Sequence, residues 1–265
     1  MQHGLQFMSS MMKVLEKIQA TQQRNIEKAA EMAATAIAGD GWCNLFGTGH
    51  SHLPCIDAYP RIGSYPGFRP MVELALSTPN YMVTDNGLLQ GTFLEQVPGY
   101  GDVILQSHQV EPPDCMIIFS NSGVNAVLID IALGCRRRGV PVIAITSVAH
   151  SSSTNSRHAS GKRLMDIADL VIDNCMPPGD ALVSIEGLEH NVASGSTLAS
   201  VFIIQAIVAE TAAKLTRMGK PPLVLHSHNR RDAQEEAAHT SMELNVQEYG
   251  RRLGRKLSRL DTRMV

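Results

Sequence analysis

The sequence predicts an α/β protein: a three-layer sandwich with a central, mainly parallel sheet and a long N-terminal helix. Short apolar runs typical of buried strands alternate with segments whose apolar residues have helical spacing. Three of these runs end in small polar residues, at 47–51, 120–125 and 146–147. In a parallel sheet such turns meet at the carboxyl ends of the strands, where ligands bind. The sequence therefore predicts one ligand site at that edge.

Residues 5–38 are predicted to form one helix, which Gly39-Asp40-Gly41 ends. This helix is longer than one core needs, so we expect it to pack partly against another subunit. We assign 1–39 to a helical extension. A strand at 42–46 then runs into Gly47-Thr-Gly-His-Ser-His52 and a helix from Ser51 to Tyr59. The next predictions are a Pro- and Gly-rich loop at 59–70 and a possible strand at 71–76.

The centre of the chain is the apolar run Cys115–Phe119, followed by Ser-Asn-Ser-Gly-Val-Asn at 120–125 and helical spacing from Val124. The first turn of a helix has unpaired N–H groups and a partial positive charge, so a hydroxyl-rich turn there suits an anion such as phosphate. The turn has no lysine and is not a nucleotide-triphosphate P-loop. The alternative is an ordinary strand-to-helix turn with a helix cap.

The remaining elements follow the same alternation. Before the central strand, helical pieces at 92–95 and 102–107 flank Pro98-Gly99. After it we expect a strand at 140–146, a polar loop or lid at 147–161, a strand at 170–174, a possible strand at 181–188 and a largely buried helix at 198–217. Residues 40–219 form the predicted main domain. Residues 220–265, helical from about 231 to 257, form a tail packed on that domain or on a partner subunit.

Two turns together carry a resemblance to a known family. Gly47-Thr-Gly-His-Ser51 and Ser120-Asn-Ser-Gly-Val-Asn125, each after a strand, resemble the sugar isomerase (SIS) domain family over about residues 40–215. Within it, the chain is most like the uncharacterised SIS proteins related to phosphoheptose isomerases. The resemblance implies a flavodoxin-like SIS fold that binds a phosphorylated sugar.

The resemblance places the phosphate on the three turns, with the glycines acting through backbone N–H groups. The phosphate-binding candidates are Gly49, Ser51, Ser120, Asn121, Ser122, Gly123, Asn125, Thr146 and Ser147. Candidates for contacts to the rest of the substrate are Thr48, His50 and Arg61. Arg61 and Arg69 lie in a loop and could bind a carboxylate or a second phosphate; the alternative is that both side chains are solvated.

The resemblance also implies a glutamate that shuttles a proton, and Glu95 has the matching place in the chain. A carboxylate does this when burial raises its pKa towards neutral; the alternative is a solvated helix charge. His52 and His190 are the other catalytic candidates, with Asp57 ranked third. Phosphoheptose isomerases carry a catalytic histidine on the last buried helix. This chain has none there, so His190 would act from the preceding loop.

Three functions remain open: a metal-independent aldose–ketose isomerase, a non-catalytic phosphosugar sensor, and an etherase or lyase acting on an amino-sugar phosphate. The net charge of −2 gives no positive electrostatic field that would attract nucleic acid or an anionic membrane. The apolar stretch 198–209 is too short to span a bilayer. Five cysteines without zinc-site spacing favour reduced thiols in a cytoplasm, and we expect no metal and no cofactor. The expected partners are a small phosphosugar and further copies of the chain.

Overall fold

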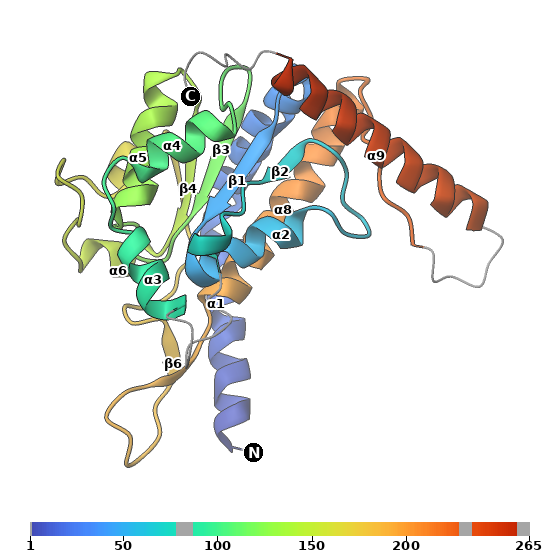
Figure 1. Ribbon diagram of the computed structural model, residues 1–265. Helices are drawn as coiled ribbons and strands as arrows, with labels where there is room; N and C mark the ends of the chain where they lie inside the picture. The colour runs from blue at the N-terminus through green and yellow to red at the C-terminus, as the bar shows by residue number, and fades with distance from the viewer. Residues whose placement is uncertain (1, 78–86, 228–234, 259–265) are drawn as a thin grey trace.

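A computed structural model describes residues 2–77, 87–227 and 235–258 (Figure 1). Its centre is a five-stranded parallel sheet of β1 (Cys43–Gly47), β2 (Phe68–Pro70), β3 (Cys115–Phe119), β4 (Val142–Thr146) and β5 (Leu170–Asp173). The strand order is β2-β1-β3-β4-β5. This is the flavodoxin-like order, in which the direction of winding reverses between β1 and β3. The predicted three-layer α/β fold and its long N-terminal helix are confirmed.

Helices cover both faces of the sheet and create two cores (Figure 1). Every residue of β1, β3 and β4 is buried, which explains why these strands read as continuous apolar runs. On one face lie α1 (Gln2–Ala38), α2 (Leu53–Ala58) and α8 (Ser196–Arg217). On the other face lie α4 (Tyr100–Ser107), α5 (Ala126–Arg137) and α7 (Leu164–Ile167), with α3 (Gly87–Leu94) before α4.

Small residues set how closely the helices approach. The buried alanines of α1, among them Ala29, Ala30 and Ala33, let it pack along α8. Gly101 of α4 is pressed onto α5, because a Cβ there would lie 2.5 Å from the carbonyl oxygen of Val127. Within the described residues α8 is also the one helix whose length and composition would suit a membrane span. Its contacts with α1 and α2 are those of a core helix.

Four predicted elements need correction. The predicted helix 51–59 is a short 3₁₀ turn, η1 (Gly49–His52), followed by α2. The predicted strand 71–76 is wrong: Phe68–Pro70 pairs with β1 instead, and the chain then turns through η2 (Leu74–Leu76). The polar loop 147–161 begins with α6 (Val148–Ser152). The predicted strand 181–188 shortens to β6 (Ala181–Val183), which pairs antiparallel with β7 (Val192–Ser194) outside the main sheet.

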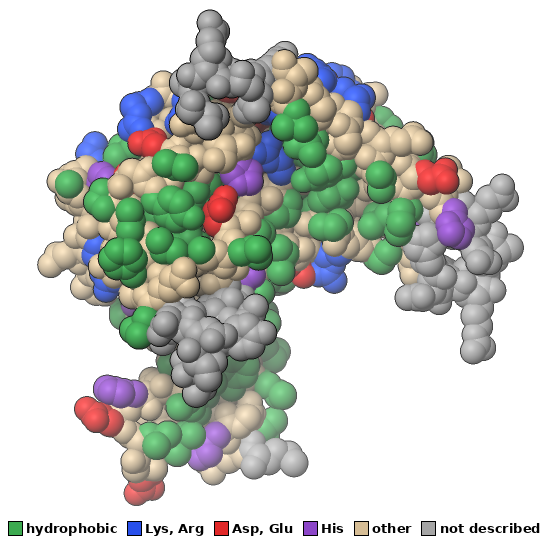
Figure 2. Space-filling view, in the orientation of Figure 1, with side chains coloured by type: hydrophobic (Ala, Val, Ile, Leu, Met, Phe, Trp, Pro, Cys, Tyr) green, Lys and Arg blue, Asp and Glu red, His purple; other side chains and the backbone are tan. Residues whose placement is uncertain are grey.

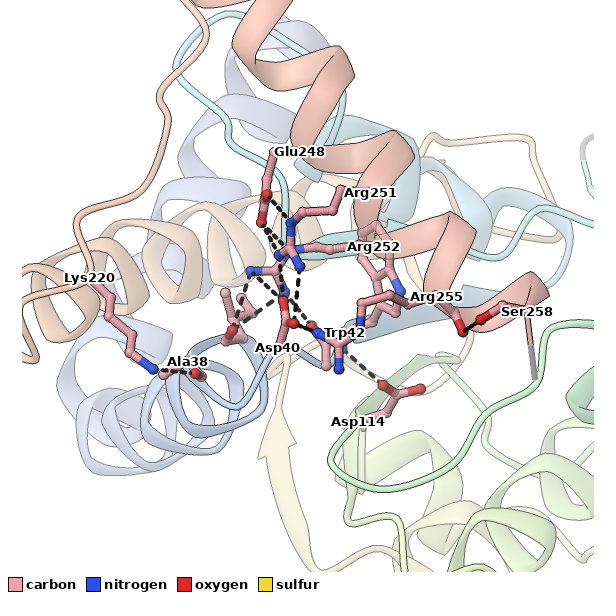
Figure 3. Close-up of polar contacts among 12 residues, drawn as sticks. Ala38, Asp40, Trp42, Asp114, Lys220, Glu248, Arg251, Arg252, Arg255 and Ser258 are labelled. Atoms are coloured by element: carbon pink, nitrogen blue, oxygen red, sulfur yellow. Dashed lines mark hydrogen bonds and ion pairs between the residues drawn. The ribbon is translucent and has the colours of Figure 1, made fainter.

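The C-terminal helix α9 (Glu235–Leu257) docks on the sheet's amino edge through polar and aromatic groups. Tyr249 stacks on Tyr59, with ring centroids 5.4 Å apart. Asp40 forms ion pairs with arginines 251, 252 and 255 (Figure 3). The first half of α9 projects from the body (Figure 1). Residues 231–234 of the predicted helix and 259–265 of the predicted tail lie outside the described residues.

Candidate functional site

The three polar turns lie side by side at the carboxyl edge of the sheet. Parallel pairing sets Gly47 beside Phe119 and Phe119 beside Ile145, so the residues that follow each strand are neighbours. Hydrogen bonds join the turns: the Ser120 N–H donates to Ile145 O at 3.1 Å, and the Ser147 N–H to Asn121 O at 3.2 Å. The edge at which β1 and β3 meet is where the winding reverses. The fold therefore places the two motifs where doubly wound sheets bind ligands.

The turn after β1 folds back tightly on itself. A Cβ on Gly47 would lie 2.1 Å from Ser51 O, so only glycine fits. Gly49 has a φ of +53°, a conformation that glycine adopts readily. The buried His52 ring donates from Nδ1 to Gly49 O at 2.6 Å and holds this shape. His50 is exposed and Ser51 is half-buried, so solvent reaches both residues of this turn.

The turn after β3 is held by some of its polar groups and leaves others open. Ser120 Oγ accepts from the Gly123 N–H at 3.0 Å, and Asn121 Oδ1 accepts from Asn174 Nδ2 at 3.0 Å. Gly123 has a φ of +65°. The half-exposed Ser122 side chain makes no hydrogen bond within the part of the chain that the structure describes. Ser122 is thus the hydroxyl of this turn that is available to a ligand.

The hydroxyls after β4 bind the protein itself. Thr146 Oγ1 donates to Asn121 O at 3.2 Å. Ser147 caps α6: its Oγ accepts from the His150 N–H at 3.0 Å and donates to Met176 O at 2.7 Å. Both side chains are fully buried. They shape the turn, and their predicted contacts with phosphate stay a prediction.

Glu95 lies where the first two turns meet. Asn125 Nδ2 donates to its Oε2 at 2.6 Å, and a Cβ on Gly49 would lie 3.9 Å from its Oε1. Its backbone carbonyl accepts from the Val127 N–H in the first turn of α5 at 3.1 Å. Burial raises the pKa of Glu95, while a hydrogen bond from Thr48 and the charge of Arg157 partly oppose the rise. Glu95 therefore holds a proton at higher pH than an exposed glutamate does.

Other candidates lie apart from the three turns. His190 is on the exposed connection between β6 and β7, where Glu189 is its ion-pair neighbour. Arg61 pairs with Asp57, whose other oxygen accepts from Gln205 Nε2 at 2.7 Å. Arg69 is buried over the Trp42 ring. Within the described residues no hydrogen bond or ion pair joins these side chains to the turns.

The structure also adds residues that the sequence did not single out. Arg157, from the loop after α6, places Nη1 3.4 Å from Asn125 Oδ1. The next residue, His158, contacts Asp130 of α5. The only sign in the sequence was a basic residue within a serine-rich loop, and no spacing ties that loop to the turn at 120–125.

The donor set at the edge suits an anion better than a metal. Across residues 2–77, 87–227 and 235–258, no group of three or more His, Cys, Asp or Glu side chains is arranged to hold a metal ion. Backbone N–H groups, hydroxyls and amides predominate, with one carboxylate and one guanidinium beside them. Such groups can bind a phosphate and present a carboxyl group to what is attached to it.

The chain matches a known family model and several known proteins. Residues 6–147 match the model of the SIS domain. The chain is 36% identical over 224 residues to a UPF0309 protein of Shouchella clausii, covering 84% of this chain and 89% of that one. It is 37% identical over 203 residues to a UPF0309 protein of Oceanobacillus iheyensis, covering 77% and 80%.

Two solved structures resemble the chain at low identity. One is a phosphoheptose isomerase from Francisella tularensis, with a TM-score of 0.49, 12% identity and coverage of 77% of this chain and 93% of that one. The other is the sugar isomerase domain of an RpiR transcription factor from Sphaerobacter thermophilus, with a TM-score of 0.48, 18% identity and coverage of 82% and 93%.

Proposed function

This chain belongs to the SIS domain family, and we propose that it binds a phosphorylated sugar at the carboxyl edge of β1, β3 and β4 and isomerises it. The observation that carries the proposal is the position of the Glu95 carboxyl group. It lies between two phosphate-suited turns, 2.6 Å from the Asn125 amide, and burial raises its pKa. An anchor for phosphate and a proton carrier for the sugar thus share one site.

In this proposal the turns hold the phosphate and Glu95 moves the proton. Backbone N–H groups and the hydroxyls of Ser51 and Ser122 bind the phosphate oxygens, and the positive end of α5 adds to the attraction. The Glu95 carboxylate removes the proton from C2 of the open-chain aldose while a solvent water donates a proton to O1, which gives an enediol. Glu95 then returns its proton to C1 while the C2 hydroxyl gives its proton to the hydroxide left by that water, so an aldose becomes a ketose with no redox change.

A non-catalytic sensor is the second candidate, and a specific observation favours it. Glu95 is fastened to the start of α5 by its backbone carbonyl and by its side chain, as a purely structural carboxylate would be. His190, the predicted second catalytic group, is exposed on the β6–β7 hairpin. In this reading the same turns bind the phosphosugar without turnover.

A ligand panel followed by isotope exchange tests these functions. Thermal shift with sugar phosphates, each paired with its unphosphorylated sugar, identifies a ligand whose effect depends on phosphate. NMR of that ligand in deuterated water then reports chemistry. Deuterium at C1 or C2 supports isomerisation, a new product from a cleaved substituent supports the etherase or lyase, and binding without exchange supports the sensor. No phosphate-dependent binding at all would refute the proposal.

We also propose that the protein is a homo-oligomer, a dimer or tetramer, of the cytoplasm. Apolar side chains are exposed on the projecting part of α1 and on α8: Leu5, Met8, Met12, Leu198 and Phe202. Figure 2 shows hydrophobic side chains along the projecting part. A second copy would remove this surface from water. All five cysteines are free and buried, which is in keeping with a reducing compartment.

A further inference from the structure

The loop at 153–163, between α6 and α7, is built onto the turn at 120–125. The Arg157 N–H donates to Val124 O at 2.9 Å, and the Leu164 N–H to Gly123 O at 2.8 Å. Within the loop, Ser156 Oγ donates to Lys162 O at 2.7 Å. These bonds fix the backbone of Arg157 relative to the turn that is suited to phosphate.

The guanidinium of Arg157 has no strong partner in this arrangement. It reaches Asn125 Oδ1 at 3.4 Å, a long contact with a neutral amide, and it makes no ion pair within the described residues. The same Asn125 side chain donates to Glu95 Oε2. The positive charge of Arg157 lowers the pKa of Glu95, against the larger effect of burial. A fixed backbone thus presents an unpaired cation beside the first turn of α5.

His158 and Asp130 hold this loop against α5. The Ser160 N–H donates to His158 Nδ1 at 3.0 Å, so in the neutral ring Nε2 carries the hydrogen. Nε2 donates to Asp130 Oδ1 at 3.1 Å. The other oxygen of Asp130 accepts from the Gly99 N–H at 2.7 Å, four residues after Glu95. Asp130 therefore ties the loop of Arg157 and the segment of Glu95 to the same helix.

We propose that Arg157 is a ligand-contacting residue of the phosphosugar site, where its guanidinium binds a phosphate oxygen, and that the His158–Asp130 contact positions it. The proposal rests on the proposed function. A guanidinium offers forked donors that match phosphate, and charge-assisted hydrogen bonds of this kind are stronger than neutral ones. Arg157 would favour the dianionic phosphate ester over the neutral sugar, and it would partly neutralise the repulsion between that phosphate and Glu95.

Binding of two probes to matched variants tests the contact. Arg157→Met removes the guanidinium, and Lys162→Met removes one charge from an exposed residue of the same loop. Affinities for inorganic phosphate and fructose 6-phosphate are measured by ³¹P NMR titration. We expect Arg157→Met to weaken both by about tenfold or more, Arg157→Lys to lie between it and wild type, and Lys162→Met to change either by less than about twofold. Equal affinities for Arg157→Met and Lys162→Met would overturn the contact.

A double-mutant cycle tests the positioning role. His158→Ala should weaken phosphate binding in the wild-type background and have no further effect in Arg157→Met, because it acts through that side chain. Additive losses would overturn this role. Ser122→Ala separates the two proposals. If it weakens binding while Arg157→Met does not, the inference alone fails. If the wild type binds neither probe nor any sugar phosphate of the panel, both fail.

Discussion

Replacing Lys256 by methionine is expected to destabilise the protein by about 3 kcal/mol, because it leaves a buried carboxylate without its cation. Lys256 Nζ lies 2.8 Å from Asp114 Oδ2, and the side chains are 10% and 0% exposed. Methionine keeps most of the apolar stem and removes the charge. Breaking a buried ion pair costs about 3–5 kcal/mol. The lower end applies because Asp114 still accepts from the Trp42 N–H at 2.9 Å and from Asn44 at 3.2 Å.

Lys214→Met is the matched control. Lys214 Nζ also lies 2.8 Å from its partner, Glu31, and its side chain is 11% exposed. The Glu31 side chain is 59% exposed, so water solvates the carboxylate once the lysine is gone. An ion pair of this kind contributes less than about 1 kcal/mol. The two substitutions therefore differ in the burial of the acid and in the hydrogen bond that Lys256 Nζ also donates to Gln109 O at 2.9 Å.

Urea unfolding followed by Trp42 fluorescence measures both changes. Trp42 is the one tryptophan of the sequence, and its ring lies 4.9 Å from that of Tyr249 on α9, so it reports directly on the docking of this helix. Equal losses of unfolding free energy in the two variants would refute the reasoning. Adding Asp114→Asn to Lys256→Met should recover part of the loss, because the uncompensated charge is gone.

Four further predictions concern the site and the assembly. Glu95→Gln should lower turnover by about a hundredfold or more while affinity changes only a few-fold, since only the proton chemistry is lost; steady-state kinetics on the substrate found by NMR checks this. Ser122→Ala should weaken phosphate binding by roughly tenfold to a hundredfold with little loss of stability, whereas the reverse pattern in calorimetry and melting would make it a structural cap. Because the charge of Arg157 lowers the pKa of Glu95, Arg157→Met should move the acidic limb of the pH–rate profile to higher pH; an unmoved limb contradicts it. Sedimentation at micromolar concentration should show a dimer or tetramer, and a clean monomer would exclude it.

The strongest sequence patterns were also the most local ones. Both ends of the strand Cys115–Phe119 were predicted correctly, because a short apolar run between polar neighbours is typical of a strand buried on both faces of a sheet. β2 was missed because Phe68-Arg-Pro70 is three residues long and contains a charge and a proline. Its pairing with β1 depends on the tertiary fold, and no local pattern of apolar residues indicates it.

The parts of the site that depend on folded loops were harder to predict. Glu95 could be placed near the turns from its position in the chain, but its bond to Asn125 joins residues 30 positions apart. Arg157, which follows Asn125 by 32 positions, contacts the same side-chain amide. On α9 the helix was predictable and its docked face was not, because Asn245, Arg252 and Lys256 point inward while Val246 and Leu257 are exposed.

The pairing of β1 with β3 has a consequence for the newly made chain. Cys43 pairs with Cys115, so 72 more residues must be synthesised after Cys43 before its partner in β3 exists. At the usual pace of translation this takes roughly 4 to 14 s, during which β1 can have no partner on that side. The two turns can form one site only after the chain has passed residue 125 and β3 has paired with β1. In the proposed function, a ligand would therefore stabilise only chains in which this pairing has formed, and truncated chains that end before β3 would gain no stability from it.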